Sequence, residues 1–150
     1  MPGKFYLIKN PGFPDTGLKK TGSGYEYVKC QKLTDTDEDL WRFQKSSNFR
    51  RFGYKDYQTY YIFNKKYWAD RLFSSSYGLQ TFVRQYHDEL EFILVKERIW
   101  EFKIIDRNNQ TFEQNTKRCG FHNRVNENNT ETWKFVMEGT LKLTAERGIF

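Results

Sequence analysis

Short runs in which apolar and polar residues alternate make up most of this chain, and turn-forming residues separate them. Runs of about four to eight residues, rich in aromatic and β-branched side chains and bounded by Gly, Pro, Asn, Asp or Ser, are typical of β-strands. The strands that this pattern predicts lie at 5–9, 25–30, 40–44, 59–63, 81–86, 92–95, 100–105 and 140–143. Turn clusters fall between them, at 10–12, 14–17, 21–24, 74–78, 106–109 and 126–130. Many short strands at this spacing favour an all-β barrel or sandwich.

Two short phrases recur along the chain and divide it into three similar units. The first is an aromatic residue, an isoleucine two positions later, and Asn or Asp two positions after that; it occupies 6–10, 60–64 and 102–106. The second contains Trp followed two positions later by Phe; it occupies 40–43, 99–102 and 132–135. Internal repetition with a period of about 20–50 residues indicates an architecture of repeated structural units.

The repeat predicts one domain over 1–150, with units at about 5–58, 59–101 and 102–150. Residues 36–45 are compatible with a helical turn, but the second phrase within them favours a strand. Each unit has room for four strands, which is the plan of a β-trefoil: a barrel closed by hairpins, without edge strands that could aggregate. We therefore predict an all-β fold, a β-trefoil with three pseudo-symmetric four-strand units. Its recurring Trp and Phe residues are predicted to fill the core, and the alternative is that they are exposed stacking platforms for sugar rings.

Composition narrows the class further. Aromatic residues make up 19% of the chain, and they supply large core side chains and favour strands. Alanine occurs only at Ala69 and Ala145, which excludes a helical bundle. No apolar run approaches the roughly 20 residues that span a bilayer, so no transmembrane segment is predicted.

The combination of Tyr-x-Ile-x-Asn, a downstream Leu and then Trp-x-Phe resembles the ricin B-chain-like lectin modules of the β-trefoil superfamily. The resemblance extends over nearly the whole chain. Insect trefoil modules of hemolymph or saliva look similar as well. Those lectins usually have Gln two positions before the Trp, where this chain has Asp39, Arg98 and Glu131. The resemblance implies a β-trefoil fold and sugar-binding residues in the loop that follows each Tyr-x-Ile-x-Asn phrase.

Those loops contain the residue types that carbohydrate recognition needs, namely an aromatic face for the sugar ring and carboxylates or amides for its hydroxyls. Trp68 is the one Trp outside the repeated phrases, so symmetry does not explain it as core. The predicted ligand-binding residues are Asn10, Asp15, Asn64, Tyr67, Trp68 and Asp70. The structural alternative makes Asp70 a turn residue paired with Arg71, and makes each Asn a turn cap that bonds the backbone two residues on.

Positive charge is concentrated in residues 42–71, whose basic excess equals the net charge of the whole chain, +6. Aromatic residues are interleaved there, and basic stretches with aromatics can bind polyanions such as heparin-like glycans. The candidate polyanion-binding residues are Arg50, Arg51, Lys55, Lys65 and Lys66. The alternative is a solvated connection between units one and two, with its aromatics covering the barrel end. No motif for specific nucleic-acid recognition is present.

Catalytic motifs are missing from the sequence. Its histidines, His87 and His122, do not have metal-ligand spacing, and its glycines form neither a nucleophile elbow nor a phosphate loop. We predict no enzyme activity, no cofactor and no metal. The predicted function is non-catalytic, lectin-like binding of a glycan or glycoprotein. The alternatives are a protein-interaction or protease-inhibitor trefoil, and binding of an anionic polysaccharide.

The oligomeric state is left open, and for the compartment a secreted chain is favoured over the cytoplasmic alternative. Cys30 and Cys119 are compatible with two buried free thiols, and with one bridge between units one and three in an oxidising compartment. The N-terminus lacks a signal-peptide h-region. Met1 is compatible with a native cytosolic start, and with a mature secreted chain whose signal peptide has been removed.

Overall fold

The computed structural model describes residues 3–22, 28–75, 78–82, 90–115, 118–122 and 130–139. Its elements are strands and the 3₁₀ turn η1 (Asp37–Asp39). The first four strands are β1 (Tyr6–Lys9), β2 (Thr16–Lys20), β3 (Val28–Lys32) and β4 (Trp41–Phe52). The next four are β5 (Lys55–Asn64), β6 (Arg71–Ser75), β7 (Gly78–Phe82) and β8 (Phe92–Arg98). The last four are β9 (Glu101–Ile105), β10 (Thr111–Gln114), β11 (Cys119–His122) and β12 (Trp133–Met137).

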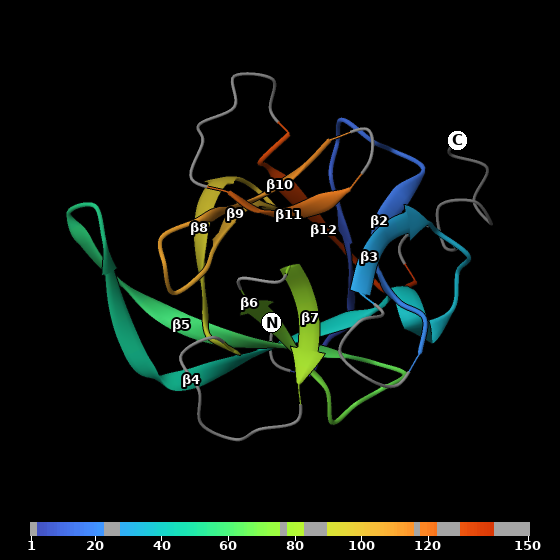
Figure 1. The fold of residues 1–150 in the computed structure, drawn as a ribbon, viewed down its shortest axis with the longest axis horizontal. Coiled ribbons are helices and arrows are strands. Elements are labelled where there is room, and N and C mark those ends of the chain that lie inside the picture. Colours follow the sequence, from blue (N-terminus) through green and yellow to red (C-terminus); the bar gives the residue numbers. More distant parts are fainter. Residues whose placement is uncertain are drawn as a thin grey trace.

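Six of these strands close into a barrel (Figure 1). The antiparallel pairs run β1–β4, β4–β5, β5–β8, β8–β9, β9–β12 and back from β12 to β1, so the ring has no free edge. The remaining strands pair as the hairpins β2–β3, β6–β7 and β10–β11, one in each group of four. This is the β-trefoil arrangement, and it confirms the fold predicted from the repeat. The limits predicted for the domain and its units stay predictions.

The first repeated phrase forms the opening strand of each unit, β1, β5 and β9. Its isoleucines, Ile8, Ile62 and Ile104, are fully buried in the barrel core. Its last residue, Asn10, Asn64 or Asp106, is also buried and caps the turn that follows, because a side-chain oxygen accepts hydrogen bonds from backbone N–H groups two to four residues on. The predicted turn-capping role of the Asn residues is therefore confirmed.

The buried Asn side chains also tie each unit to its neighbour. Asn64 Nδ2 donates to the carbonyl of Glu38 at 3.0 Å, and Asn10 Nδ2 donates to the carbonyl of Thr130. Glu38 and Thr130 both lie three residues before a core Trp, so the two contacts are equivalent under the pseudo-symmetry. A carboxylate has no N–H to donate, and Asp106 instead accepts a hydrogen bond from Ser74 Oγ at 2.7 Å.

The second repeated phrase predicts the core correctly in two of its copies and wrongly in the third. Trp41 and Trp133 are fully buried, and their Nε1 atoms donate to the carbonyls of Leu18 at 2.9 Å and Phe112 at 2.8 Å. Trp100 is 43% exposed and lies in the turn between β8 and β9 with a φ of 62°. Buried Phe92 begins β8 as the tryptophans begin β4 and β12, so the core position of unit two belongs to Phe92.

Several strands were not expected from the pattern, namely β2, β6, β10, β11 and β12. The clusters predicted as turns at 14–17 and 74–78 overlap β2, β6 and β7. In β2 the misleading feature is the pair Lys19 and Lys20, which looks solvent-facing although both side chains are buried. Each lysine meets a carboxylate, because Lys19 Nζ lies 3.6 Å from Asp39 and Lys20 Nζ lies 3.2 Å from Asp70. The predicted strand at 140–143 lies outside the described residues.

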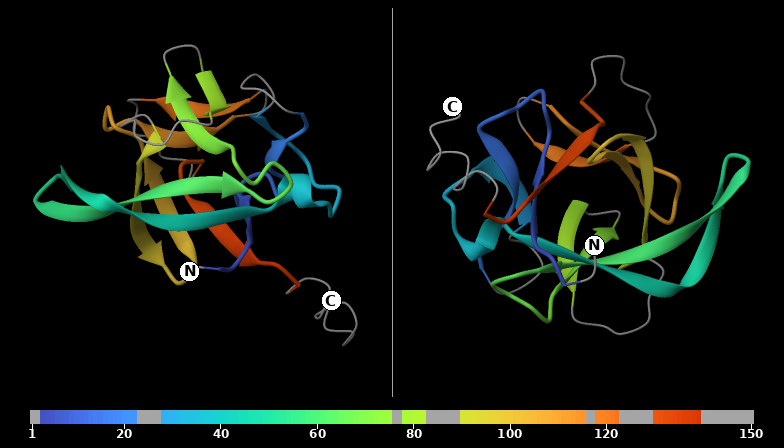
Figure 2. Two further views of the ribbon diagram at one scale, coloured as in Figure 1. Left: turned by 90° about the horizontal axis from the view of Figure 1, so that it is seen from below. Right: turned by 180° about the vertical axis from the view of Figure 1, so that it is seen from behind.

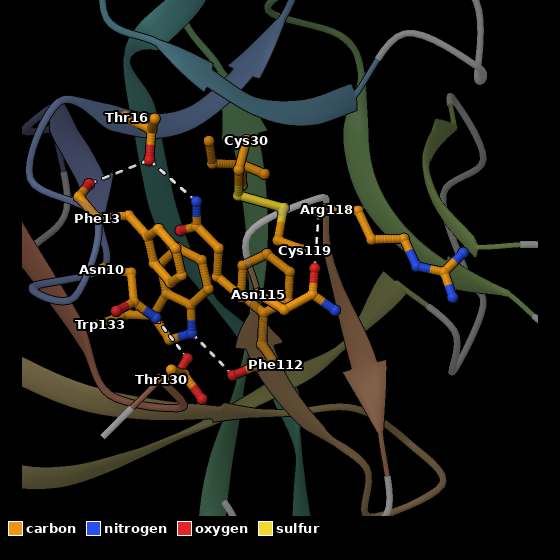
Figure 3. The surroundings of a disulfide bond; sticks show 12 residues. Asn10, Phe13, Thr16, Cys30, Phe112, Asn115, Arg118, Cys119, Thr130 and Trp133 are labelled. Atoms are coloured by element: carbon orange, nitrogen blue, oxygen red, sulfur yellow. Dashed lines mark hydrogen bonds between the residues drawn. A yellow bond between two sulfur atoms is a disulfide. The ribbon is translucent and has the colours of Figure 1, made fainter. Parts of the chain in front are cut away.

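A disulfide joins Cys30 of β3 to Cys119 of β11, with the two Cα atoms 5.9 Å apart (Figure 3). Of the two alternatives left open by the sequence, the structure therefore has the bridge between units one and three, and the free-thiol alternative is wrong. Beside it, a hydrogen bond also links units one and three, because Gln114 Nε2 donates to Thr16 Oγ1 at 3.0 Å. In the part of the chain that is described, no helix is long and apolar enough to cross a membrane.

Candidate ligand-binding sites

Trp68 lies on the loop between β5 and β6, residues 65–70, and its side chain is 77% exposed. The loop is nevertheless well braced. Asn64 Oδ1 accepts from the backbone N–H groups of Lys66 and Tyr67 at 3.1 Å each, and Asp70 N–H donates to the carbonyl of Tyr67 at 2.9 Å. The exposed indole is thus carried by a backbone with fixed turns, and this loop is called the Trp68 loop below.

Asp70 fastens the Trp68 loop to β2 of unit one. Its carboxylate forms an ion pair with the fully buried Nζ of Lys20, which also lies 5.0 Å from the centroid of the Tyr67 ring. The guanidinium of Arg71, the partner expected from the sequence, lies over the rings of Tyr61 and Phe63 at 4.8 and 5.1 Å. Asp70 therefore stabilises the attachment of the loop to β2, in addition to any contact with a ligand.

The structure brings only part of the predicted ligand set together. Tyr67, Trp68 and Asp70 share the Trp68 loop. Asn10 and Asn64 are buried under the turns that they cap, so their side chains do not face solvent in this structure. Asp15 is exposed on the β1–β2 loop, in a different unit. As ligand contacts, all of these residues stay predictions.

The basic segment 42–71 consists mainly of β4 and β5, which pair along most of their length and project beyond the body of the molecule (Figures 1 and 2). This projecting hairpin, residues 45–60, is called the arm. Gly53, with a φ of 63°, and the exposed Tyr54 form its tip. The segment is a paired, largely exposed hairpin, and Phe49 and Tyr54, two of the aromatics expected to cover the barrel end, face solvent instead.

The predicted polyanion-binding residues fall into two groups. Arg50, Arg51 and Lys55 lie on the arm. Lys65 and Lys66 lie past its base, beside acidic side chains: Lys65 pairs with Asp37 and Glu138, and Lys66 with Glu38. The hydrogen bond to Glu138, followed by the charges of Glu138 and Asp37, raises the pKa of Lys65 above its ordinary value, although partial burial opposes the shift. The structure therefore does not gather these cations into one surface.

A polar cleft of about 510 Å³ opens beside the arm, and no local pattern in the sequence predicts it. It is called the arm cleft, and its lining residues are Asn48, Phe49, Arg50, Thr59, Glu91, Arg107 and Asn108. They come from both strands of the arm, from the residue before β8 and from the β9–β10 turn. Because these segments are far apart in sequence, only the closed barrel brings them together.

The comparisons with known proteins support the fold. No family model and no curated protein matches the chain. Among solved structures, the BEL beta-trefoil has a TM-score of 0.72 at 12% identity and covers 91% of this chain and 94% of its own. SeviL bound to asialo-GM1 saccharide has a TM-score of 0.69 at 14% identity, covering 92% and 99%. The designed threefold-symmetric protein ThreeFoil has a TM-score of 0.69 at 11% identity, covering 88% and 97%. The chain is a β-trefoil, and its loose resemblance to ricin B-chain-like modules holds at the level of the fold.

Proposed function

We propose that this chain is a non-catalytic carbohydrate-binding module that binds a glycan or glycoprotein through the Trp68 loop. The observation that supports this most strongly is the 77% exposure of Trp68 on a loop that is otherwise braced by hydrogen bonds and a buried ion pair. A large exposed aromatic side chain on an ordered loop gains little from folding, whereas it offers an apolar face to a ligand.

The chemistry of the loop suits a sugar. The indole of Trp68 can pack on the apolar face of a pyranose ring while Asp70, two residues further along the loop, accepts a hydrogen bond from a ring hydroxyl. Lys20 holds the carboxylate of Asp70 in place, so little side-chain freedom is lost when a ligand binds. SeviL, a protein of the same fold, was solved with a saccharide bound, which makes glycan binding by this fold a reasonable first hypothesis.

A glycan array with the full chain tests the proposal. We expect binding to a restricted group of glycans that shares a terminal sugar. A clean negative at concentrations that detect weak lectins contradicts it. Incubating the same array for product release tests the proposal that the chain does not cleave its ligand, and a panel of proteases tests the inhibitor alternative.

A further inference from the structure

We propose that Asn109 is a modification site, the acceptor for an N-linked oligosaccharide. The sequence Asn109-Gln110-Thr111 has the pattern that N-glycosylation requires, an Asn followed two positions later by Ser or Thr with no Pro between them. The chain contains one other such sequon, whose acceptor Asn128 lies outside the described residues. Sequons also arise by chance, so the place of Asn109 in the fold decides whether an oligosaccharide can be attached there.

Asn109 lies in the β9–β10 turn, residues 106–110, which is braced without its side chain. Asp106 Oδ1 accepts hydrogen bonds from the N–H groups of Asn108 at 3.0 Å and Gln110 at 2.8 Å. The backbone closes the turn as well, because Asn109 N–H donates to the Asp106 carbonyl at 3.1 Å and Asp106 N–H donates to the Gln110 carbonyl at 3.0 Å. An oligosaccharide on the amide of Asn109 would therefore leave these four hydrogen bonds intact.

The amide nitrogen of Asn109, the atom that would bond the sugar, is available for modification. Asn109 is exposed, and in the described part of the chain its side chain has no hydrogen-bond partner. Its φ of 59° is a left-handed turn conformation that Asn tolerates well. Asn10 and Asn64 are the contrast, because both are buried and their Nδ2 atoms donate to the carbonyls of Thr130 and Glu38.

The β9–β10 turn also differs in composition from the corresponding loops of the other two units. The β1–β2 loop contains Phe13, and the Trp68 loop contains Tyr67 and Trp68, whereas residues 106–110 are all polar. An oligosaccharide on this turn would cover no aromatic side chain of the turn itself. The modification shares no residue with the Trp68 loop and does not depend on the function proposed for that loop.

The disulfide is a second, independent observation that points the same way. The bridge between Cys30 and Cys119 is a feature of chains that mature in an oxidising compartment, such as the lumen of the endoplasmic reticulum. N-glycosylation is a modification of secreted chains, which pass through that lumen. Passage through one compartment would therefore account for the disulfide and give Asn109 access to the modifying enzyme.

The reaction is a group transfer from an oligosaccharide linked to a polyprenyl diphosphate. Nδ2 of Asn109 attacks the anomeric carbon of the sugar, and an N–C bond forms as the C–O bond to the diphosphate breaks. The polyprenyl diphosphate leaves with the bonding electron pair, and Nδ2 releases one proton to the solvent. Nothing is oxidised or reduced. Thr111 supplies the hydroxyl that completes the sequon.

Secretion of the full chain from a eukaryotic cell, behind a cleavable signal peptide, tests the proposal. We expect peptide mapping by mass spectrometry to find an oligosaccharide on Asn109 that a glycosidase removes. Asn109→Gln should lose it. Asn108→Gln is the matched control, because Asn108 is exposed in the same turn but lies outside the sequon, and this variant should keep the oligosaccharide.

Two substitutions of Thr111 separate the sequon from the fold. Thr111→Ser retains a hydroxyl and should keep the oligosaccharide on Asn109. Thr111→Val removes the hydroxyl but retains a β-branched side chain that suits strand β10, so it should fold and lose the oligosaccharide. This pair keeps the test decisive if Asn109→Gln does not fold. Asn128→Gln removes the other sequon and should leave the modification of Asn109 unchanged.

Two results overturn the inference: an unmodified Asn109 in the secreted parent chain, or modification of Asn109 that survives Thr111→Val. If the cell does not secrete the chain, translation in the presence of endoplasmic-reticulum microsomes gives the answer on the Asn128→Gln variant, whose remaining sequon is that of Asn109. We expect a slower-migrating product that glycosidase treatment reverses, and the absence of this shift contradicts the proposal. A negative glycan array would contradict the Trp68 proposal and leave this one standing.

Discussion

Trp133 in the barrel and Trp68 on the β5–β6 loop are the same residue type in opposite environments. Trp133 is fully buried, stacks on Phe112 with ring centroids 4.2 Å apart, and donates its Nε1 hydrogen to the Phe112 carbonyl. Trp133 also has a pseudo-symmetric counterpart, Trp41, whereas Trp68 has none and is 77% exposed. Positions repeated between units therefore hold the fold together, and positions unique to one unit are where binding should be sought.

Trp133→Ala changes a position that is repeated between units, and it should give the largest loss of stability. It removes a buried aromatic ring and leaves the Phe112 carbonyl without its donor, so the free energy of unfolding should fall by about 3–5 kcal/mol. Urea denaturation followed by far-UV circular dichroism measures the change. Trp133→Phe keeps a ring and should lose less. A loss below about 1 kcal/mol for the alanine variant would contradict the assignment of Trp133 to a tightly packed core.

The disulfide links units one and three only, so it is not a repeated feature, and yet it should stabilise the fold. Replacing Cys30 and Cys119 together by Ser opens a link between residues 89 apart, and the free energy of unfolding should fall by about 2–5 kcal/mol. Denaturation of the parent with and without a reducing agent measures the same effect without a mutation. If reduction leaves the unfolding midpoint of the parent unchanged, the disulfide between units one and three does not stabilise the fold.

Asp70→Asn tests whether a residue of the proposed sugar-binding loop also stabilises the fold. The change removes the ion pair to the fully buried Lys20, and the free energy of unfolding should fall by about 1.5–3 kcal/mol. Asp15→Asn, at an exposed carboxylate on the corresponding loop of unit one, is the matched control and should change stability by less than about 0.5 kcal/mol. If the two variants unfold alike, Asp70 is not needed to hold the Trp68 loop on β2.

Lys65→Met should give the smallest effect. Its ion pairs with Asp37 and Glu138 are partly exposed, so their loss should lower the free energy of unfolding by about 0.2–1 kcal/mol. The pKa of Lys65 is raised in the folded protein, so this stabilisation is present below the ordinary pKa of lysine and disappears as the pH rises through the raised value. The stability difference between parent and variant should therefore be constant near neutral pH and shrink in strong alkali. A difference that grows with rising pH would contradict the assigned pairing.

The fold could largely be predicted because the residues of the first phrase determine which side chains enter the core and where the next turn begins. In Tyr6-x-Ile8-x-Asn10, the alternation places two side chains in the core, and the terminal Asn caps the next turn. The second phrase misled at Trp100, since its copy at 99–102 runs from the β8–β9 turn into β9 and still matches the strand pattern by composition. The buried lysines of β2 also escaped prediction, because their carboxylate partners are supplied by other segments.

The two candidate sites also differ in how far they could be predicted from the sequence. Trp68 could be singled out from the sequence because it departs from the repeat, and its exposure agrees with that reasoning. The arm cleft could not be predicted, because Asn48, Glu91 and Arg107 meet only through the closed barrel and an irregular register in the arm. A short pattern can reveal a residue without a symmetric role, whereas a cleft between distant segments becomes visible only in three dimensions.

Binding and stability of Trp68→Ala, measured on the same sample, test the central claim most directly. The ligand is the strongest glycan from the array, titrated calorimetrically, and stability is followed by urea denaturation. We predict loss of measurable binding and a change in the free energy of unfolding of less than about 0.5 kcal/mol, because the side chain is mostly exposed. Unchanged glycan affinity would contradict the claim that the Trp68 loop is the binding site. A loss of stability near the roughly 3–5 kcal/mol typical of a buried aromatic would show instead that Trp68 belongs to the folded core.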